Sequence, residues 1–179
     1  MRRRLLIIII VLAVILSVFI ISGCSALSDS EANTNKQFVK MRPELVVRYK
    51  KLNDSLKLAE TIGGTRDVTK DGLAAYKAYS KAVKNKNVNE ELKYSRELEN
   101  AIGRLRANAS KSPRLQGSQE LKDSITAIDE ATVSKNAKDA YKKAANSYED
   151  KRTSWRYLLS ATFAGYSSKD TLEFSEPTK

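Results

Sequence analysis

Apolar residues recur at three- and four-residue spacings along most of this chain, which places them on single faces of α-helices. No stretch alternates polar and apolar residues for long enough to predict a β-strand. The 179 residues include only seven glycines and three prolines, so few positions interrupt a helix. We therefore predict an all-α fold, arranged as an antiparallel up-and-down four-helix bundle that follows an N-terminal signal or membrane helix.

The apolar stripes indicate where these helices lie. The first stripe consists of Phe38, Met41, Leu45, Tyr49, Leu52, Leu56 and Ala59. The second consists of Leu73, Tyr76, Tyr79 and Val83, and the third of Leu92, Leu98, Ile102, Leu105 and Ala109. The fourth consists of Leu121, Ile125, Ile128 and Thr132, and the fifth of Ala137, Tyr141, Ala144, Tyr148, Trp155 and Leu159. We expect the third and fifth stripes to face each other in the core, with Glu97, Arg104 and Arg106 mostly off the third.

Capping residues predict the helix boundaries. Pro43 falls in the first turns of the first helix, where its missing N–H is tolerated, and Gly63-Gly64 ends that helix. Pro113 predicts that the third helix stops near Ser112, because the residue before a proline avoids the α region. Ser118 is the expected N-cap of the helix that follows.

Two regions lie outside the stripes. Residues 24–35 are mostly polar and show no periodicity, which predicts a flexible tether. Residues 158–174 carry too many apolar side chains for a free tail, so we expect them to fold back onto the bundle and turn at Gly165. The predicted organisation is thus a signal or anchor at 1–23, a tether at 24–35 and the bundle at 36–175.

The start of the chain has the features of a secretory signal. Three arginines precede an apolar run, Leu5–Ile21, and the run ends in Ile21-Ser22-Gly23-Cys24. An aliphatic residue, two small ones and a cysteine also match the bacterial lipobox, in which the thiol receives a diacylglyceryl group and the preceding bond is cut. Cys24 is the only cysteine, and two acyl chains anchor a protein stably where one does not. Lipid attachment at Cys24 is our preferred hypothesis.

Two alternatives for this segment stay open. Leu5–Gly23 is 19 residues long, close to the roughly 20 that cross a bilayer, so it could be a retained transmembrane helix. It could also be a cleaved signal without a lipid. All three hypotheses leave the arginines on the cytoplasmic side and place Ser25 onward outside. The expected localisation is the extracytoplasmic face of the cell membrane.

The residues that enzymes use most are scarce. The chain has no histidine, which removes the commonest general base and the commonest metal ligand. Four glutamates could supply paired carboxylates, but we expect them on a solvated helix face beside Lys93 and Arg96: Glu90, Glu91, Glu97 and Glu99. Tyr141 and Tyr148 are seven residues apart on one stripe, which predicts core packing rather than a stacking surface for nucleic acid. We expect no enzymatic activity, no metal and no cofactor.

Many residues in the C-terminal half keep the spacing of a known family. They begin with Glu97-Leu98, Ala101, Ile102, Arg104, Leu105, Ala107, Ala109, Pro113 and Leu115. They continue with Ala137-Lys138, Tyr141, Ala144, Tyr148, Leu159, Ala161, Gly165, Tyr166, Leu172 and Glu173. In this spacing the chain resembles the LemA family, and Arg42-Pro43-Glu44-Leu45-Val46 is similar to that family's Ile-Pro-Asn-Leu-Val.

This chain departs from the family pattern at several positions. Ser112 stands where a tyrosine is usual, Trp155 replaces a phenylalanine, and Arg156 replaces the proline after it. Residues 131–134 lack the family's Glu-Asn motif, and we expect the first extracytoplasmic helix to be reduced to the tether. The resemblance implies a membrane-attached four-helix bundle and supplies no catalytic residues.

These observations predict a membrane-anchored, extracytoplasmic protein of the bacterial envelope with a non-catalytic binding or scaffolding role. Its partners would be the membrane and an envelope protein or polymer. Without residues 1–23 the chain keeps 29 basic and 21 acidic residues, a net charge of +8. The alternative is therefore a basic module that binds a polyanion such as anionic lipid, wall polymer or nucleic acid. A steep dependence of binding on salt would distinguish this alternative.

Overall fold

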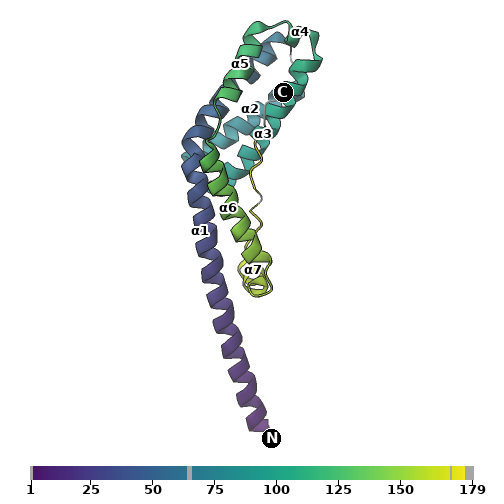
Figure 1. The fold of residues 1–179 in the computed structure, drawn as a ribbon. Coiled ribbons are helices and arrows are strands. Elements are labelled where there is room, and N and C mark those ends of the chain that lie inside the picture. The colour runs from purple at the N-terminus through teal and green to yellow at the C-terminus, as the bar shows by residue number, and fades with distance from the viewer. Residues whose placement is uncertain (1, 64–65, 170, 176–179) are drawn as a thin grey trace. The chain divides into compact units, whose positions relative to one another are not determined.

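The computed structural model describes residues 2–63, 66–169 and 171–175, and in these ranges it contains helices and no strand (Figure 1). The helices are α1 (Arg2–Ile62), α2 (Arg66–Lys84), α3 (Val88–Lys111), α4 (Pro113–Gln116), α5 (Gln119–Glu130), α6 (Lys135–Thr153) and α7 (Leu158–Ala164). The predicted all-α fold is confirmed. The antiparallel four-helix arrangement stays a prediction.

The chain forms two compact units. Unit 1 comprises Met1–Gln37 and Ala140–Thr171, and unit 2 comprises Phe38–Asp139 and Leu172–Lys179. Helices α1 and α6 therefore each contribute residues to both units.

The prediction of a flexible tether at residues 24–35 is wrong, because α1 is helical throughout this segment. The three- and four-residue spacing of buried positions extends back through Ser30 and Leu27 to Gly23. Thr34 is also buried, and its Oγ1 lies 3.0 Å from the carbonyl oxygen of Ser30 and 3.1 Å from that of Ala144. Polar side chains that find such partners can occupy a buried helix face. The expected shortening of the first extracytoplasmic helix is wrong for the same reason.

Pro43 lies inside α1 rather than in its first turns. A proline has no N–H to donate to the carbonyl of the residue four positions earlier, so it normally weakens a helix interior. Here the residues on both sides are packed, since Phe38, Met41, Leu45 and Tyr49 are at most 1% exposed. We attribute the continuity of α1 to this tertiary packing, which contributes most of the stability of helices in proteins.

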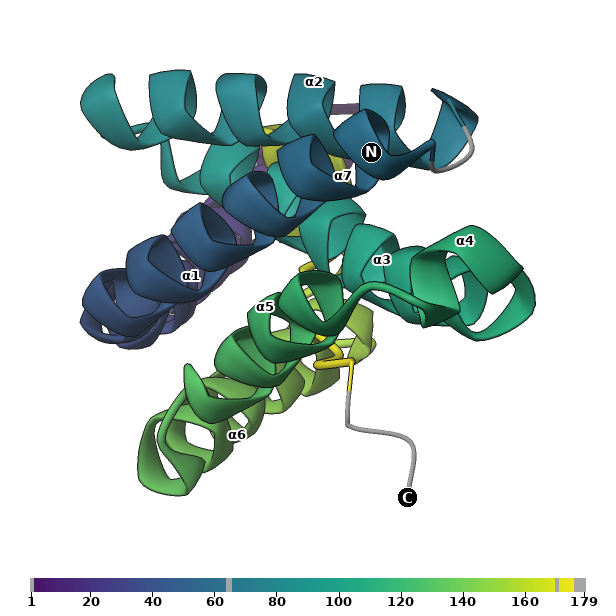
Figure 2. The ribbon, with the colours of Figure 1, turned by 90° about the horizontal axis from the view of Figure 1, so that it is seen from above.

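In unit 2, α2 lies alongside α3 (Figures 1 and 2). The predicted core stripe of α3 is confirmed, because Leu98, Ile102 and Leu105 are at most 1% exposed. From α2, the buried ring of Tyr79 meets that of Tyr49 edge to face, with centroids 5.0 Å apart. Aromatic pairs favour this geometry because the positive ring edge faces the negative ring face.

Several predicted helix ends are confirmed. Gly63, at φ +102°, follows α1, while Gly64 lies outside the described residues. Helix α3 ends at Lys111 with Ser112 as its C-cap, directly before the proline. Ser118 Oγ accepts a hydrogen bond from the Leu121 N–H at 3.2 Å, as expected of an N-cap.

In unit 1, α6 lies beside α1 and runs in the opposite direction (Figure 1). Leu27, Tyr148 and Ala161 form a buried apolar cluster, and Tyr157 and Tyr166 pack against it. The cluster confirms the prediction that Tyr148 belongs to the core. It also joins α1, α6 and α7 within this unit.

The prediction that the last long helix continues to Leu159 with Trp155 in the core is wrong. Helix α6 ends at Thr153, and the Trp155 side chain is 77% exposed. The Ser154 N–H bonds the carbonyl of Lys151, and the Tyr157 N–H bonds that of Ser154. These three-residue bonds turn the chain out of the helix before α7 begins.

The tail beyond α7 folds back, as predicted. Gly165 adopts the left-handed conformation at φ +70° and ends α7. The Tyr148 hydroxyl then donates to the Ser167 carbonyl at 2.8 Å, and Lys169 Nζ lies 2.9 Å from a carboxylate oxygen of Glu31. In unit 2, Leu172 is 6% exposed. The apolar side chains of α7 itself do not follow this pattern and are largely exposed.

Candidate functional site

The first candidate site is the apolar part of α1. Its large side chains from Leu6 to Phe19, and that of Ile21, are 41–69% exposed, whereas Ile20 is half-buried. An 18-residue stretch of this helix has a mean hydropathy of 3.2, and among the described helices only α1 is long and apolar enough to cross a membrane. Contiguous apolar surface of this extent on a protein marks contact with a membrane or a partner.

Cys24, the predicted lipid-attachment residue, lies within α1 and is partly buried. Its Sγ is 3.9 Å from the Ser160 carbonyl oxygen, and its own carbonyl accepts a hydrogen bond from the Tyr166 hydroxyl at 3.0 Å. Ser160 Oγ donates to the Ile20 carbonyl at 3.0 Å, four residues earlier. Residues on both sides of the predicted cleavage point therefore contact α7 and the segment after it.

Gly23 permits the close approach of α7. A Cβ added at Gly23 would overlap Ser160 Oγ and lie 2.9 Å from Ser160 Cβ. Small residues let two helices approach closely, so glycine at this position has a packing role whether or not it belongs to the predicted lipobox.

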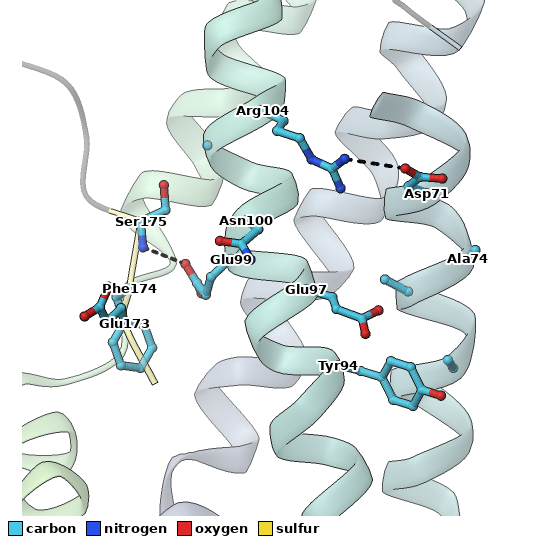
Figure 3. A pocket seen from close by; sticks show the side chains of 13 residues that line it. Asp71, Ala74, Tyr94, Glu97, Glu99, Asn100, Arg104, Glu173, Phe174 and Ser175 are labelled. Carbon is cyan, nitrogen blue, oxygen red and sulfur yellow. Dashed lines mark hydrogen bonds and ion pairs between the residues drawn. The ribbon is translucent and has the colours of Figure 1, made fainter. Parts of the chain in front are cut away.

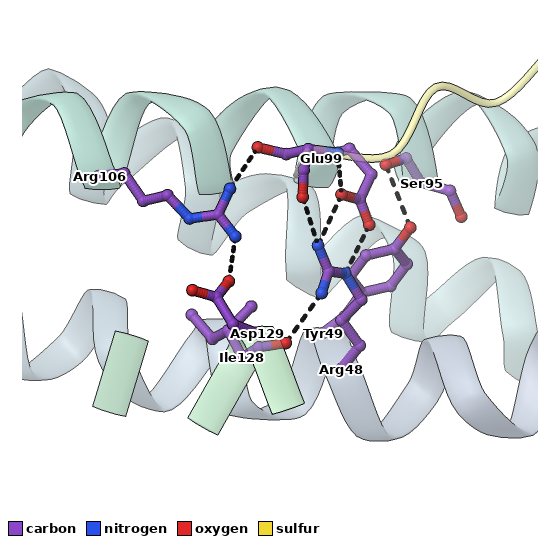
Figure 4. Close-up of polar contacts among 8 residues, drawn as sticks. Arg48, Tyr49, Ser95, Glu99, Arg106, Ile128 and Asp129 are labelled. Carbon is purple, nitrogen blue, oxygen red and sulfur yellow. Dashed lines mark hydrogen bonds and ion pairs between the residues drawn. The ribbon is translucent and has the colours of Figure 1, made fainter. Parts of the chain in front are cut away.

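The second candidate site is a buried ionic network in unit 2 (Figure 4). Arg48 of α1 donates to both carboxylate oxygens of Glu99 on α3, at 2.8 and 3.1 Å. It also donates to the carbonyls of Ile128 on α5, at 2.8 Å, and of Ser175 in the tail, at 3.1 Å. The two charged side chains are only 4% and 3% exposed. One guanidinium thus connects four segments of unit 2.

The prediction that the four glutamates of α3 lie on a solvated face is wrong for two of them. Glu90 and Glu97 are exposed, but Glu91 and Glu99 are buried. Glu91 accepts hydrogen bonds from Arg42 at 2.7 and 2.8 Å. The arginine partners come from α1, and they remove these two carboxylates from the set that could act in catalysis.

Arg106 is a further correction. Its side chain is 11% exposed, pairs with Asp129 of α5 and donates to Ser175 Oγ at 2.8 Å. Arg104, by contrast, is 49% exposed and lies off the core face as expected. Arg106, which was expected to lie off the core face, is therefore part of the network in Figure 4.

The third candidate site is a groove along α3, between α2 on one side and residues 173–175 on the other (Figure 3). Its volume is about 1030 Å³. Small residues leave this space: Ala74, Ala75 and Ala78 on α2 and Gly103 on α3. Lys138 Nζ lies 4.5 Å from the centroid of the Phe174 ring, a cation–π contact that helps to fix the tail at the groove edge.

The groove is predominantly acidic. Asp71, Glu97 and Glu173 line it, together with the Tyr94 ring. Arg104 Nη1 lies 3.4 Å from Asp71 Oδ2, but both side chains are about half exposed, so water and salt screen this pair. The arrangement suits positively charged or hydrogen-bond-donating groups of a partner and does not suit a polyanion.

Burial perturbs the titration of three tyrosines. Burial, followed by the nearby Glu99 carboxylate, raises the pKa of Tyr49 well above its ordinary value. Burial and the Glu91 carboxylate likewise raise the pKa of Tyr79. Burial, then Glu31 and Glu149, raises the pKa of Tyr148 to about 12. These hydroxyls therefore stay protonated at neutral pH.

Sequence reasoning missed the groove and the arginine partners. Arg48 could have been found, because it lies at the three- and four-residue spacing between Leu45 and Leu52. The groove had no signal, since it depends on small residues from two helices. Tyr141 and Tyr148 are buried as predicted, and the described ranges contain no group of three or more Asp, Glu or Cys residues placed to hold a metal ion.

Comparison with known proteins identifies the family. No curated protein and no solved structure matches this chain. The LemA family model matches residues 29–179, which is most of the chain. This range includes the groove, the ionic network and the part of α1 that follows the apolar segment. The chain belongs to the LemA family.

Proposed function

We propose that this protein is a membrane-anchored, non-catalytic binding or scaffolding protein whose chain from Ser25 onward lies on the extracytoplasmic side of the bacterial cell membrane. The proposal depends on one observation about α1. Its residues 6–21 form a mostly exposed apolar surface, and from Gly23 onward one face of the same helix is buried. An apolar helix of this length is stabilised by a bilayer and would be costly to expose to water.

Two features support the orientation and the mode of anchoring. The three arginines before the apolar run favour a cytoplasmic start, which leaves the rest of the chain outside. The contact of Ser160 with Ile20 and Gly23 favours a retained helix, since cleavage before Cys24 would remove that contact. Lipid attachment at Cys24 is the alternative anchor and stays a prediction.

A binding role fits the chemistry of the groove better than a catalytic one. The sequence has no histidine, and the buried carboxylates Glu91 and Glu99 are held by arginines. The acidic lining of the groove complements a basic or amide-rich segment of an envelope partner. The net charge of +8 that motivates the polyanion alternative is not located in this groove.

Anchoring and orientation can be tested on the native chain in its own membrane. We expect the protein to stay in the membrane fraction after an alkaline carbonate wash and to be digested by protease added outside intact spheroplasts. Release by carbonate would contradict the anchor, and full protection from the external protease would contradict the orientation.

The mass of the mature protein distinguishes the two anchors. A retained helix predicts the full mass of 20.0 kDa for both the wild type and Cys24→Ala. Lipidation predicts a wild-type mass without residues 1–23 and with a diacylglyceryl group, and an unprocessed, larger Cys24→Ala protein. A cleaved, unlipidated product in the soluble fraction would contradict both anchors.

The groove can be tested with a photo-cross-linking residue in the full-length protein. At Tyr94, inside the groove, we expect one discrete cross-linked species in native membranes. Lys57, an exposed residue of α1 outside the groove, is the matched control and should give none. Equal labelling at both positions would contradict a specific binding role for the groove.

A further inference from the structure

Four large apolar side chains of unit 1 are exposed together where the chain turns from α6 into α7. Trp155 is 77% exposed, Leu158 54%, Leu159 44% and Phe163 76%. We call these four residues the α7 patch. Single exposed apolar residues are normal, but a cluster of four within nine residues indicates that something covers it.

The α7 patch adjoins the outer end of the apolar segment of α1, within the same unit. Ser160, between the patch residues, donates to the Ile20 carbonyl at 3.0 Å. A small hollow is lined on one side by Phe19, Ser22 and Gly23 and on the other by residues 155–157. A span of about 20 residues that begins at Leu5 would end at Cys24. The patch therefore lies at the level where the span leaves the hydrocarbon.

The composition of the turn matches this depth. Tryptophan and tyrosine concentrate at the boundary between hydrocarbon and headgroups, because one part of the ring is apolar and the other donates a hydrogen bond. Tyr157 follows Trp155 by two residues, and the exposed Arg156 lies 5.9 Å from the Trp155 ring. An arginine here can reach a lipid phosphate while the apolar side chains lie below it.

We propose that the α7 patch inserts into the headgroup–acyl boundary of the outer leaflet and forms a second membrane contact beside the span. Lipid is the occupant because the proposed span would place lipid around the neighbouring residues Phe19 and Ile21, which are 41% and 69% exposed on the same unit. The inference rests on the proposed membrane anchoring. It applies to the retained helix; with a lipid on Cys24, only the hydrogen bond from the Tyr166 hydroxyl to the Cys24 carbonyl would hold this region beside the anchor.

Trp155 is the only tryptophan in the chain, so the wild-type protein carries its own reporter. The full-length protein would be reconstituted into phosphatidylcholine vesicles with plain or brominated acyl chains. Insertion predicts that brominated lipid quenches at least about half of the Trp155 emission. It also predicts a blue-shifted emission maximum and weak quenching by aqueous acrylamide.

A matched control moves the reporter along the same unit. In Trp155→Phe/Ala32→Trp the single indole sits at an exposed position of α1, eight residues beyond Cys24 and about 12 Å further along the helix. This variant should be quenched several-fold less by brominated lipid and several-fold more by acrylamide. Far-UV circular dichroism would check that its helix content is unchanged.

Flotation of the same vesicles separates the two claims. If the wild type floats with the vesicles while brominated lipid quenches Trp155 no more than the Ala32→Trp reporter, the insertion of the patch is overturned and the anchoring stands. Blue-shifted emission that brominated lipid does not quench would assign the patch to a protein contact and also overturn the proposal. Failure of the wild type to float would overturn the anchoring on which it rests.

Discussion

The buried pair of Arg48 and Glu99 allows a prediction of stability with a defined magnitude. Arg48 makes four hydrogen bonds, two to the carboxylate and two to the carbonyls of Ile128 and Ser175. Glu99 also accepts from the Ser175 N–H at 2.9 Å. Removing one partner of a buried pair costs about 3–5 kcal/mol, because the other charge is left buried without compensation.

The two single substitutions should differ in cost. In Arg48→Met, Glu99 keeps only the Ser175 N–H, and the buried Ile128 carbonyl and the partly buried Ser175 carbonyl lose their donor, so we expect a loss of about 5 kcal/mol. In Glu99→Gln, Arg48 keeps its two carbonyl acceptors, so we expect a loss of about 3 kcal/mol. The double variant Arg48→Met/Glu99→Met leaves no buried charge at this pair. It should lose far less than the sum of the single variants, which gives a coupling energy of several kcal/mol.

Urea unfolding of the full-length protein in detergent micelles, followed by circular dichroism, measures these free energies. Arg104→Met is the matched control, because its pair with Asp71 is about half exposed and should contribute at most about 1 kcal/mol. If Arg104→Met were as destabilising as Arg48→Met, burial would not explain the effect. If the double variant lost as much as the two single variants combined, the pair would not be coupled and the reasoning would be refuted.

Three further predictions use the same unfolding assay or limited proteolysis. Leu98→Ala should cost about 2–5 kcal/mol because its side chain is fully buried, whereas exposed Glu97→Ala should stay within about 0.5 kcal/mol, and equal effects would contradict the assigned faces. Gly23→Ala should push α7 away from α1, so protease should cleave residues 155–169 faster than in the wild type. Adding Ser160→Gly removes the overlapping side chain and should restore resistance. Wild-type resistance in Gly23→Ala alone would contradict the close packing. The pKa of Tyr49 is raised by burial, so the folded state keeps a proton that the unfolded chain releases, and stability falls as pH rises above about 10 by up to about 1.4 kcal/mol per pH unit. Tyr49→Phe should make this decline shallower by that amount, and an unchanged pH dependence would show that Tyr49 does not contribute to it.

Apolar periodicity and capping chemistry predicted the parts of the fold that depend on neighbouring residues. The core stripe of α3 and the N-cap at Ser118 were confirmed because each follows from local spacing alone. The end of α1 at Gly63 was also predicted from local chemistry, because glycine favours the positive φ that often ends a helix.

The errors occurred where buried positions are occupied by polar residues. Ser30 and Thr34 continue the buried face of α1, but a stripe defined by apolar residues alone stops before them. Glu91 and Glu99 were predicted on the surface because charged residues usually lie there. They are buried because arginines from a distant part of the chain neutralise their charges, and local spacing does not reveal these partners. Trp155 was placed in the core because its spacing continues that of Tyr141 and Tyr148, and no sequence signal marked the turn after Thr153.

The continuity of α1 through Cys24 fixes the rotational phase of the apolar segment relative to the stripe at Gly23, Leu27 and Ser30. Each residue in a helix advances the side-chain direction by about 100° and the axis by about 1.5 Å. Inserting one alanine between Ile21 and Ser22 would therefore turn the apolar segment by about 100° relative to the part of α1 that packs against α7, whereas a flexible linker would absorb the change. Inserting seven residues, close to two full turns, would restore the phase and lengthen the helix by about 10 Å. If this helix is the proposed membrane anchor, it transmits twist, and the register of a single helix sets the side from which a neighbouring membrane protein can approach.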